Sequence, residues 1–241
     1  MHFYVLASGS KGNCCVVIGN TTKLVIDCGS TKHYLLESFK AIDLDYQKVD
    51  ALLLTHSHSD HISQLKLFNQ CLVYAPFKLD SKECIEVIPF ETFQIGEFMI
   101  KTIPLSHDIG ITVGYIIQND ENKFVYITDT GYFKRDYYTI INNADYYVFE
   151  SNHDIPMLMK SQRPYQLKQR IISDSGHLDN ETSADILANV IGNNTKEIIL
   201  AHLSEAANTP QLALDSARNR INDPNISIRV AYQYKIIEGG Q

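Results

Sequence analysis

Residues 51–62 read ALLLTHSHSDHI, an apolar run followed directly by three histidines and an aspartate. The apolar run has the length and composition of a buried β-strand. Side chains two positions apart in an extended turn face the same side, so His56 and His58 can share one metal ion. Asp60 and His61 stand where the next helix is expected to begin, and they can face a second ion. This spacing predicts a metal centre, because buried groups that carry charge are costly without a partner.

Four further expected strands also lead into a metal-capable side chain. His107 follows the strand that ends in TIPLS, Asp129 follows FVYIT, His153 follows YYVFESN, and His202 follows EIILA. Loops at the ends of strands are where a rigid scaffold displays its chemical groups. Asp129 has two carboxylate oxygens and could therefore bridge two ions.

We expect two adjacent divalent metal ions at this cluster. Imidazole ligands suit zinc, iron and related ions, and the added carboxylates make manganese a further option. Two neighbouring ions lower the pKa of a shared water and stabilise the charge that develops on a substrate oxygen. This chemistry suits hydrolysis of an ester, a thioester, a lactam or a phosphodiester, and the ligand set alone does not choose among them.

The rest of the chain alternates short apolar segments with polar turns, which predicts an α/β protein with mixed sheets covered by helices. Helices are expected over Ile62–Asn69, after Asn180 as an N-cap, and after Thr209 with Pro210 in the first turn. No repeat or Gly/Ser-rich linker is visible, so we expect one domain over residues 1–241. The expected strands are β-branched or aromatic: Phe3–Leu6, Cys14–Ile18, Leu24–Ile26, Ala51–Leu54, Leu72–Tyr74, Phe98–Ile103, Val113–Gln118, Phe124–Ile127, Tyr146–Phe149, Glu197–Leu200 and Ile226–Ala231.

Composition limits the compartment and the partners. The chain has five cysteines, an odd number, and no C-x-x-C motif. This pattern indicates free thiols in a cytoplasmic protein. No apolar run approaches the ~20 residues that span a bilayer, so no membrane partner is expected. The net charge of −7 is unlike that of most nucleic-acid binders. However, residues 157–172 carry four basic side chains and no acid, and local charge governs the binding of a polyanion.

Several motifs together carry a resemblance to a known family. The order T-H-x-H-x-D-H, His107, Asp129 and His202 resembles the metallo-β-lactamase superfamily, and within it the YycJ/WalJ group. The resemblance implies a four-layer αββα sandwich, a dinuclear metal site and a 5′→3′ DNA exonuclease linked to DNA repair, in which a metal-bridging hydroxide attacks the phosphate. The motifs that carry it are LASGSKGNCCVV (6–17), THSHSDHI (55–62), LSHD (105–108), ITDTGY (127–132), FESNHD (149–154), RPYQLKQRIISDSGHLDNE (163–181) and LAHLSEAAN (200–208).

The resemblance also implies a role for each metal-capable residue. His56, His58 and His107 would hold the first metal. Asp60, His61 and His202 would hold the second, and Asp129 would bridge the two. Asp60 and His177 would be the catalytic residues, with His177 as a general acid or phosphate contact just before a helix N-terminus that suits an anion.

Other residues are expected to contact DNA, the substrate that the resemblance implies. His153, Arg163 and Arg170 would face the substrate, although a solvated surface position is an alternative for the arginines. The turn at residues 8–13 would place Ser8 and Asn13 at the rim of the metal site. Its alternative is a hairpin turn whose glycines adopt positive φ.

Two other classes of function remain open from the sequence. A small-substrate metallo-hydrolase, such as a cyclic phosphodiesterase, lactonase or thioesterase, is favoured by the acidic net charge. A non-catalytic metal-bound module that signals through a partner protein is the other. The complete ligand set argues against the second class, because a purely structural site is normally closed and needs one metal.

Overall fold

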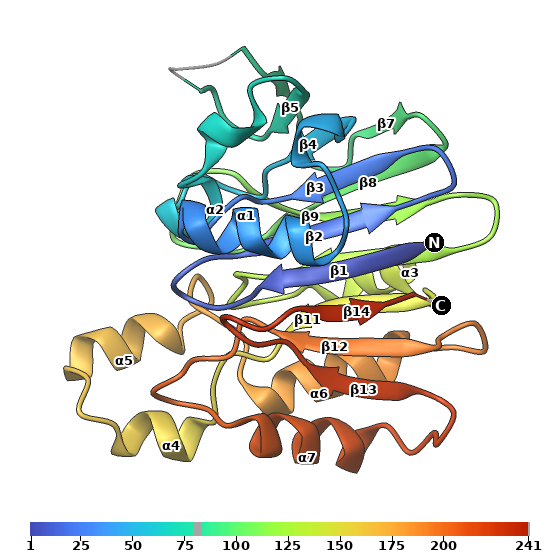
Figure 1. Ribbon diagram of the computed structural model, residues 1–241. Coiled ribbons are helices and arrows are strands. Elements are labelled where there is room, and N and C mark those ends of the chain that lie inside the picture. Colours follow the sequence, from blue (N-terminus) through green and yellow to red (C-terminus); the bar gives the residue numbers. More distant parts are fainter. Residues whose placement is uncertain (80–82, 241) are drawn as a thin grey trace.

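The computed structural model of the chain describes residues 1–79 and 83–240, and its strands form two sheets that pack face to face (Figure 1). The first sheet has the order β14-β1-β2-β3-β4-β5-β6. The second has the order β13-β12-β11-β10-β9-β8-β7. The strands of the first sheet are β1 (His2–Ala7), β2 (Cys14–Ile18), β3 (Lys23–Ile26), β4 (Ala51–Leu53), β5 (Leu72–Ala75), β6 (Ile85–Glu86) and β14 (Ile237–Gly239). Those of the second are β7 (Thr92–Ile95), β8 (Phe98–Leu105), β9 (Thr112–Gln118), β10 (Lys123–Ile127), β11 (Tyr146–Glu150), β12 (Glu197–Ala201) and β13 (Ser227–Val230).

Helices cover the outer face of each sheet, which completes the expected αββα sandwich. Leu35 and Phe39 of α1 pack in one apolar cluster with β1–β5, and Leu187 and Ala217 of α6 and α7 pack in another with β8–β13. Short 3₁₀ turns lie at Tyr46–Lys48, Leu65–Phe68 and Arg135–Tyr137. The α-helices are α1 (Lys32–Ala41), α2 (Ser59–Ile62), α3 (Tyr138–Ile141), α4 (Ile155–Lys160), α5 (Tyr165–Ile171), α6 (Asn180–Val190) and α7 (Pro210–Arg220). None of the described helices is long and apolar enough to cross a bilayer.

The central core lies between the two sheets. The ring of Phe3 on β1 packs 5.0 Å from that of Phe124 on β10 and 5.6 Å from that of Tyr146 on β11, measured between centroids. These contacts join residues from opposite halves of the chain, and all three side chains are buried. Burial of such rings removes about 150–250 Å² of surface each from water, so this interface holds the two sheets in a defined relative position.

The strand directions bring distant residues to one edge of the sandwich. Strands β10, β11 and β12 are parallel to one another, and β8 runs with them because both β8 and β10 pair antiparallel with β9. In the first sheet, β3 and β4 are also parallel. The loops that follow these strands therefore emerge together, and α4 and α5 lie beyond them (Figure 1). This topology explains why residues far apart in sequence can form one site.

Three sequence predictions differ from the structure in detail. The helix expected over Ile62–Asn69 ends at Ile62 as α2, and a 3₁₀ turn follows. The N-cap of α6 is Asp179 and not Asn180, because the Asp179 carboxylate accepts hydrogen bonds from two amides of the first turn. Short strands β6, β7 and β14 were not expected, since two to four residues carry little periodicity. The Thr209 cap with Pro210 is confirmed.

Candidate metal centre

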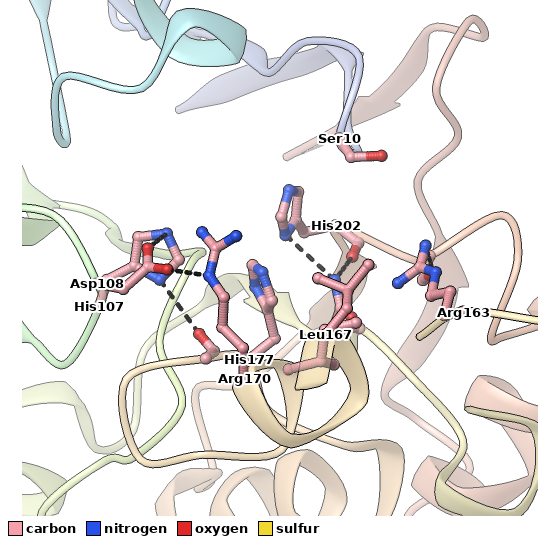
Figure 2. A pocket seen from close by; sticks show the side chains of 12 residues that line it. Ser10, His107, Asp108, Arg163, Leu167, Arg170, His177 and His202 are labelled. Carbon is pink, nitrogen blue, oxygen red and sulfur yellow. Dashed lines mark hydrogen bonds and ion pairs between the residues drawn. The ribbon is translucent and has the colours of Figure 1, made fainter. Parts of the chain in front are cut away.

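A pocket of about 290 Å³ opens at the edge where these loops meet (Figure 2). Its walls come from the loops that follow β1, β8, β11 and β12, and from α5 with the segments on either side of it. The residues that line it are Ser10, His107, Asp108, Asn152, Arg163, Leu167, Arg170, Ile171, Gly176, His177, His202 and Ser204. The histidines and carboxylates of the expected metal site adjoin this pocket.

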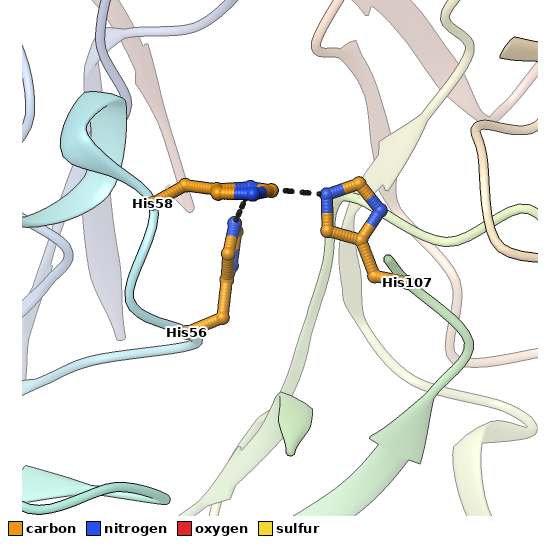
Figure 3. Close-up of side chains that lie close together, drawn as sticks. All are labelled: His56, His58 and His107. Carbon is orange, nitrogen blue, oxygen red and sulfur yellow. Dashed lines mark hydrogen bonds between the residues drawn. The ribbon is translucent and has the colours of Figure 1, made fainter. Parts of the chain in front are cut away.

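Three histidines form the first group of possible metal ligands (Figure 3). Nδ1 of His58 lies 3.1 Å from Nε2 of His56 and 3.3 Å from Nε2 of His107. His56 is held from behind, since its Nδ1 lies 3.0 Å from the hydroxyl of Thr55. Burial lowers the pKa of His56 and of His107 below the usual range, so both rings are neutral near pH 7. Three imidazoles that direct nitrogen atoms at one another are suited to bind a cation.

A second group combines Asp60, His61 and His202. Nε2 of His61 lies 3.6 Å from Oδ2 of Asp60, while Nδ1 of the same ring lies 2.8 Å from Oδ2 of the buried Asp27. Asp27 thus fixes the ring so that Nε2 faces the cluster. This is the arrangement in which an outer carboxylate orients a metal-binding imidazole.

Asp129 lies between the two groups. Its Oδ2 is 3.2 Å from Nε2 of His61, and its Oδ1 is 3.8 Å from Nε2 of His107 and 3.5 Å from Nδ1 of His202. Burial alone would raise the pKa of Asp129, but His202 and His61 outweigh it and hold this pKa well below its usual range. The carboxylate is therefore ionised and within reach of both groups.

Left-handed backbone conformations direct several of these side chains into the cluster. Asp27, Asp129 and His202 follow the ends of β3, β10 and β12, with φ of 58°, 61° and 57°. Residues with a Cβ are uncommon at such angles, and each costs on the order of 1–3 kcal/mol. The same strained turn after three strands indicates that the fold is arranged around this site.

Five buried side-chain atoms lack a hydrogen bond among the residues that the structure describes, and two of them belong to the expected metal ligands: Oδ2 of Asp129 and Nε2 of His202. Burial opposes protonation of His202, yet Asp129 and Glu150 raise the pKa of His202 to about 9. The carboxylates of Asp129 and Glu150 thus stabilise a positive charge between them. An orphaned carboxylate oxygen beside an orphaned imidazole nitrogen fits a divalent cation, which would satisfy both atoms.

Residues 22–203 match the family model described as the β-lactamase superfamily domain. This chain belongs to that family. Exodeoxyribonuclease YycJ from Bacillus anthracis is 35% identical over 97% of this chain and 94% of its own length. Exodeoxyribonuclease WalJ from Streptococcus pneumoniae is 32% identical over 96% of this chain and 92% of its own length. The chain is accordingly a metal-dependent hydrolase of the YycJ/WalJ group.

The fold of the superfamily is found along the whole described chain. The metallo-β-lactamase fold protein YhfI from Bacillus subtilis superimposes with a TM-score of 0.75 and covers 99% of each chain. Its sequence identity is 18%, so the likeness concerns the fold. It confirms the sandwich architecture that the motifs predicted.

The remaining expected site residues divide into pocket residues and buried residues. His177, Arg163 and Arg170 line the pocket (Figure 2). Nδ1 of His177 lies 2.7 Å from Oε1 of Glu150. Arg170 pairs with Asp108, and Nη2 of Arg163 donates to the Ser204 hydroxyl at 3.2 Å. These three side chains stand where a substrate would enter.

Ser8, Asn13 and His153 differ from the expected positions, because all three are buried. The Ser8 hydroxyl accepts a hydrogen bond from the backbone amide of His202 at 2.7 Å. Nδ2 of Asn13 lies 3.0 Å from Nε2 of His61 and 3.4 Å from Oδ2 of Asp60. His153 is 1% exposed and bridges to Asp179 through its backbone. Burial of all three argues against direct substrate contact. Ser8 holds the backbone of His202 in place, Asn13 contacts the side of His61 and Asp60 that faces the cluster, and His153 is a core residue.

The expected anion site before α6 is also corrected. The carboxylate of Asp179 accepts hydrogen bonds from the amides of Glu181 and Thr182 at 3.0 and 3.1 Å. The free N–H groups that would attract an anion are thus already used by the cap. His177 keeps its place in the pocket for a different reason, its contact with Glu150.

Sequence reasoning overlooked three acidic residues: Asp27, Asp108 and Glu150. Burial would raise the pKa of Glu150, but His177 and His202 outweigh it and lower this pKa to about 2. Asp27 follows β3 and Glu150 ends β11, so both occupy strand ends, as His56 and Asp129 do. The same positional rule would have found them had it been applied to every acid and not only to residues near a histidine.

Proposed function

We propose that this protein is an exodeoxyribonuclease that removes nucleotides from DNA in the 5′→3′ direction with two divalent metal ions. The observation that carries this proposal is the joining of two ligand groups through Asp129 beside a pocket that contains two arginines. The names of the YycJ and WalJ relatives support DNA as the substrate.

We assign seven residues to the two ions. His56, His58 and His107 would hold one ion, Asp60, His61 and His202 the other, and Asp129 both. Such ions, which would be zinc, manganese or iron, supply an activated water and neutralise charge on the phosphate. The unsatisfied oxygen of Asp129 supports the assignment.

The protein's own groups would orient the reactants and move a proton. Glu150 occupies Nδ1 of His177, so Nε2 is the ring nitrogen left to face a bound phosphodiester. We assign His177 the transfer of a proton to the departing oxygen, as a general acid. Asp60, part of whose side chain is exposed, would be the second catalytic residue and would orient the attacking water.

The arginines would hold the DNA backbone. Guanidinium groups bind phosphate oxygens through two parallel hydrogen bonds. The chain is acidic as a whole, so this contact depends on the local basic stretch, and binding should weaken as salt is raised.

We further propose that the protein acts in the cytoplasm, in DNA repair, and that residues 1–241 form one domain.

A nuclease assay on end-labelled DNA tests the proposal. Metal-loaded wild-type protein should release nucleotides from the 5′ end, whereas His58→Ala and Asp129→Ala should lower the rate by more than about 100-fold with the fold retained. His33→Ala is the matched control, because this exposed residue lies on α1 away from the pocket. Undiminished cleavage by metal-free Asp129→Ala protein would refute the mechanism.

A small-substrate hydrolase is the second candidate, and the size of the pocket favours it. A volume of about 290 Å³ is at the lower end of cavities that enclose a small ligand. Bis-p-nitrophenyl phosphate and a thioester should therefore be assayed beside DNA. Hydrolysis of either compound at a far higher kcat/KM than that of DNA would favour this candidate.

A further inference from the structure

The pocket has two chemically unequal ends (Figure 2). His107, Asp108 and Arg170 lie toward one end, next to the first ligand group. Ser10 and Arg163 lie toward the other end, beyond His202. Both ends carry a guanidinium, but the surroundings of the two differ.

The charge of Arg170 is largely compensated. Its Nε donates to the carboxylate of Asp108, and this contact raises the pKa of Arg170 and helps to lower that of Asp108. An anion that binds Arg170 must compete with Asp108. This end of the pocket is therefore a poor place for a group of high negative charge.

Arg163 is in the opposite situation. Its Nη2 donates to the neutral hydroxyl of Ser204, and it forms no ion pair within the part of the chain that the structure describes. Glu205, the acid that follows Ser204 in the sequence, pairs instead with Lys11 at 2.6 Å. Ser204 is buried, and its amide donates to the carbonyl of Asn152 at 2.8 Å, so its hydroxyl is fixed in place.

The neighbours of Arg163 are hydrogen-bond donors. The hydroxyls of Ser10 and Ser204 line the same end of the pocket. A guanidinium that has no acidic partner, contacts one hydroxyl and shares its end of the pocket with a second is suited to the oxygens of a phosphate. The small volume of the pocket suits the end of a strand.

We propose that Arg163, Ser10 and Ser204 form a subsite for the terminal 5′-phosphate monoester of the DNA strand. This inference rests on the proposed nuclease function. A monoester carries a charge of about −1.5 to −2 at pH 7, whereas each internal phosphodiester carries one negative charge. The end of the pocket at which Arg163 has no acidic partner among the described residues therefore favours the 5′-phosphate of the strand. A strand bound there has its first internal phosphodiesters beside the two groups of metal ligands.

Binding of single strands that resist hydrolysis tests this subsite. Metal-loaded protein is titrated into 3′-labelled oligonucleotides with a 5′-phosphate or a 5′-hydroxyl, joined by methylphosphonate linkages. Wild-type protein should bind the phosphorylated strand about tenfold more tightly. Arg163→Gln should abolish this preference, and Arg163→Lys should retain part of it, because it keeps the charge but loses the planar fork.

Arg218→Gln is the matched control, since Arg218 is an exposed arginine of α7 outside the pocket. It should leave the preference unchanged, and thermal melting should show that all variants are folded. The subsite is overturned if wild-type protein binds both strands equally or if the preference survives in Arg163→Gln. Absence of cleavage of ordinary DNA with a retained 5′-phosphate preference would overturn the nuclease function and leave the subsite standing.

Discussion

Oδ2 of Asp27 lies 2.8 Å from Nδ1 of His61, and both side chains are fully buried. The other oxygen of Asp27 accepts hydrogen bonds from the amide and hydroxyl of Thr55 at 2.9 and 3.1 Å. One carboxylate thus anchors both the residue before His56 and the ring of His61. The histidine-rich loop is held in place by a residue from a different strand.

Asp27→Asn should weaken metal binding about 10–100-fold, the usual cost of losing an outer carboxylate. The amide cannot accept from His61 and from both Thr55 donors as the carboxylate does. Metal affinity is measured by competition with a chelator of known affinity. Asp50→Asn is a useful control, because Asp50 is an exposed acid that accepts a hydrogen bond from the amide of Lys23 and lies outside the cluster. An unchanged affinity in Asp27→Asn would contradict the orienting role.

Glu150→Gln should lower kcat about 10–100-fold and also reduce metal content. Glu150 contacts Nδ1 of His177 at 2.7 Å, Nδ1 of His202 at 3.0 Å and the amide of Thr130 at 2.8 Å. A neutral amide cannot serve all three donors. Loss of the contact with His202 should appear as a lower metal content. Loss of the contact with His177 should appear as a lower kcat when metal is saturating. If both quantities match those of a Glu37→Gln control, the role of Glu150 is refuted.

Metal binding should release protons and tighten as pH rises. In the metal-free protein the pKa of His202 is raised to about 9, and that of His61 is also raised, so both rings hold protons at neutral pH. A metal must displace these protons, and its apparent affinity should rise up to about tenfold per pH unit for each proton released, until about pH 9. Calorimetry in two buffers of different ionisation enthalpy counts the protons. An affinity that is constant from about pH 6 to 9 would contradict the prediction.

The folding stability of the metal-free protein should fall as pH rises, in contrast to the metal affinity. Protonated His202 is paired with Glu150 and Asp129, and its pKa is above that of an unfolded histidine. This stabilisation is complete below the unfolded pKa and is lost as pH rises through about 9. Chemical denaturation of chelator-treated protein at several pH values measures it.

Gly29→Ala should displace α2 and weaken the second ligand group. A Cβ at Gly29 would stand 1.6 Å from the carbonyl oxygen of Asp60 and 2.8 Å from the amide of Asn13, which real contacts do not allow. The backbone of Asp60 must move, so we expect lower metal content and a loss of about 1–3 kcal/mol in stability, as for other overpacked sites. Gly110→Ala, whose Cβ meets nothing within 4 Å, reports the cost of positive φ alone. Equal effects of the two changes would refute the displacement.

The sequence pattern predicted that the metal-capable residues gather at one site because they follow a local rule, and the family resemblance divided them into two groups. Five of the expected apolar strands lead into a metal-capable side chain, and the ends of strands of like direction meet at one edge. Thus His107 and His202, 95 positions apart in sequence, could be predicted to converge before their distances were known. The strands themselves were recognisable because buried segments are short runs of apolar residues.

The direction and burial of individual side chains depended on the tertiary structure. Ser8, Asn13 and His153 are polar residues in loops, a pattern equally typical of a rim and of a buried support. Asp27 and Glu150 look like ordinary acids in the sequence, yet the fold places each against a metal-capable imidazole. Such choices depend on contacts between residues far apart in the chain, which no local spacing encodes.

The amino-acid sequence by itself thus determined most strands and helices of this protein and the residues that gather at one edge of its sheets, because periodicity and strand ends are local properties. The four-layer arrangement was expected only from the family resemblance. Only the tertiary structure decided which oxygen faces which nitrogen, which arginine lacks an acidic partner, and which polar groups are buried. These follow from the packing of two sheets against each other, where a side chain's environment is set mainly by residues distant in sequence.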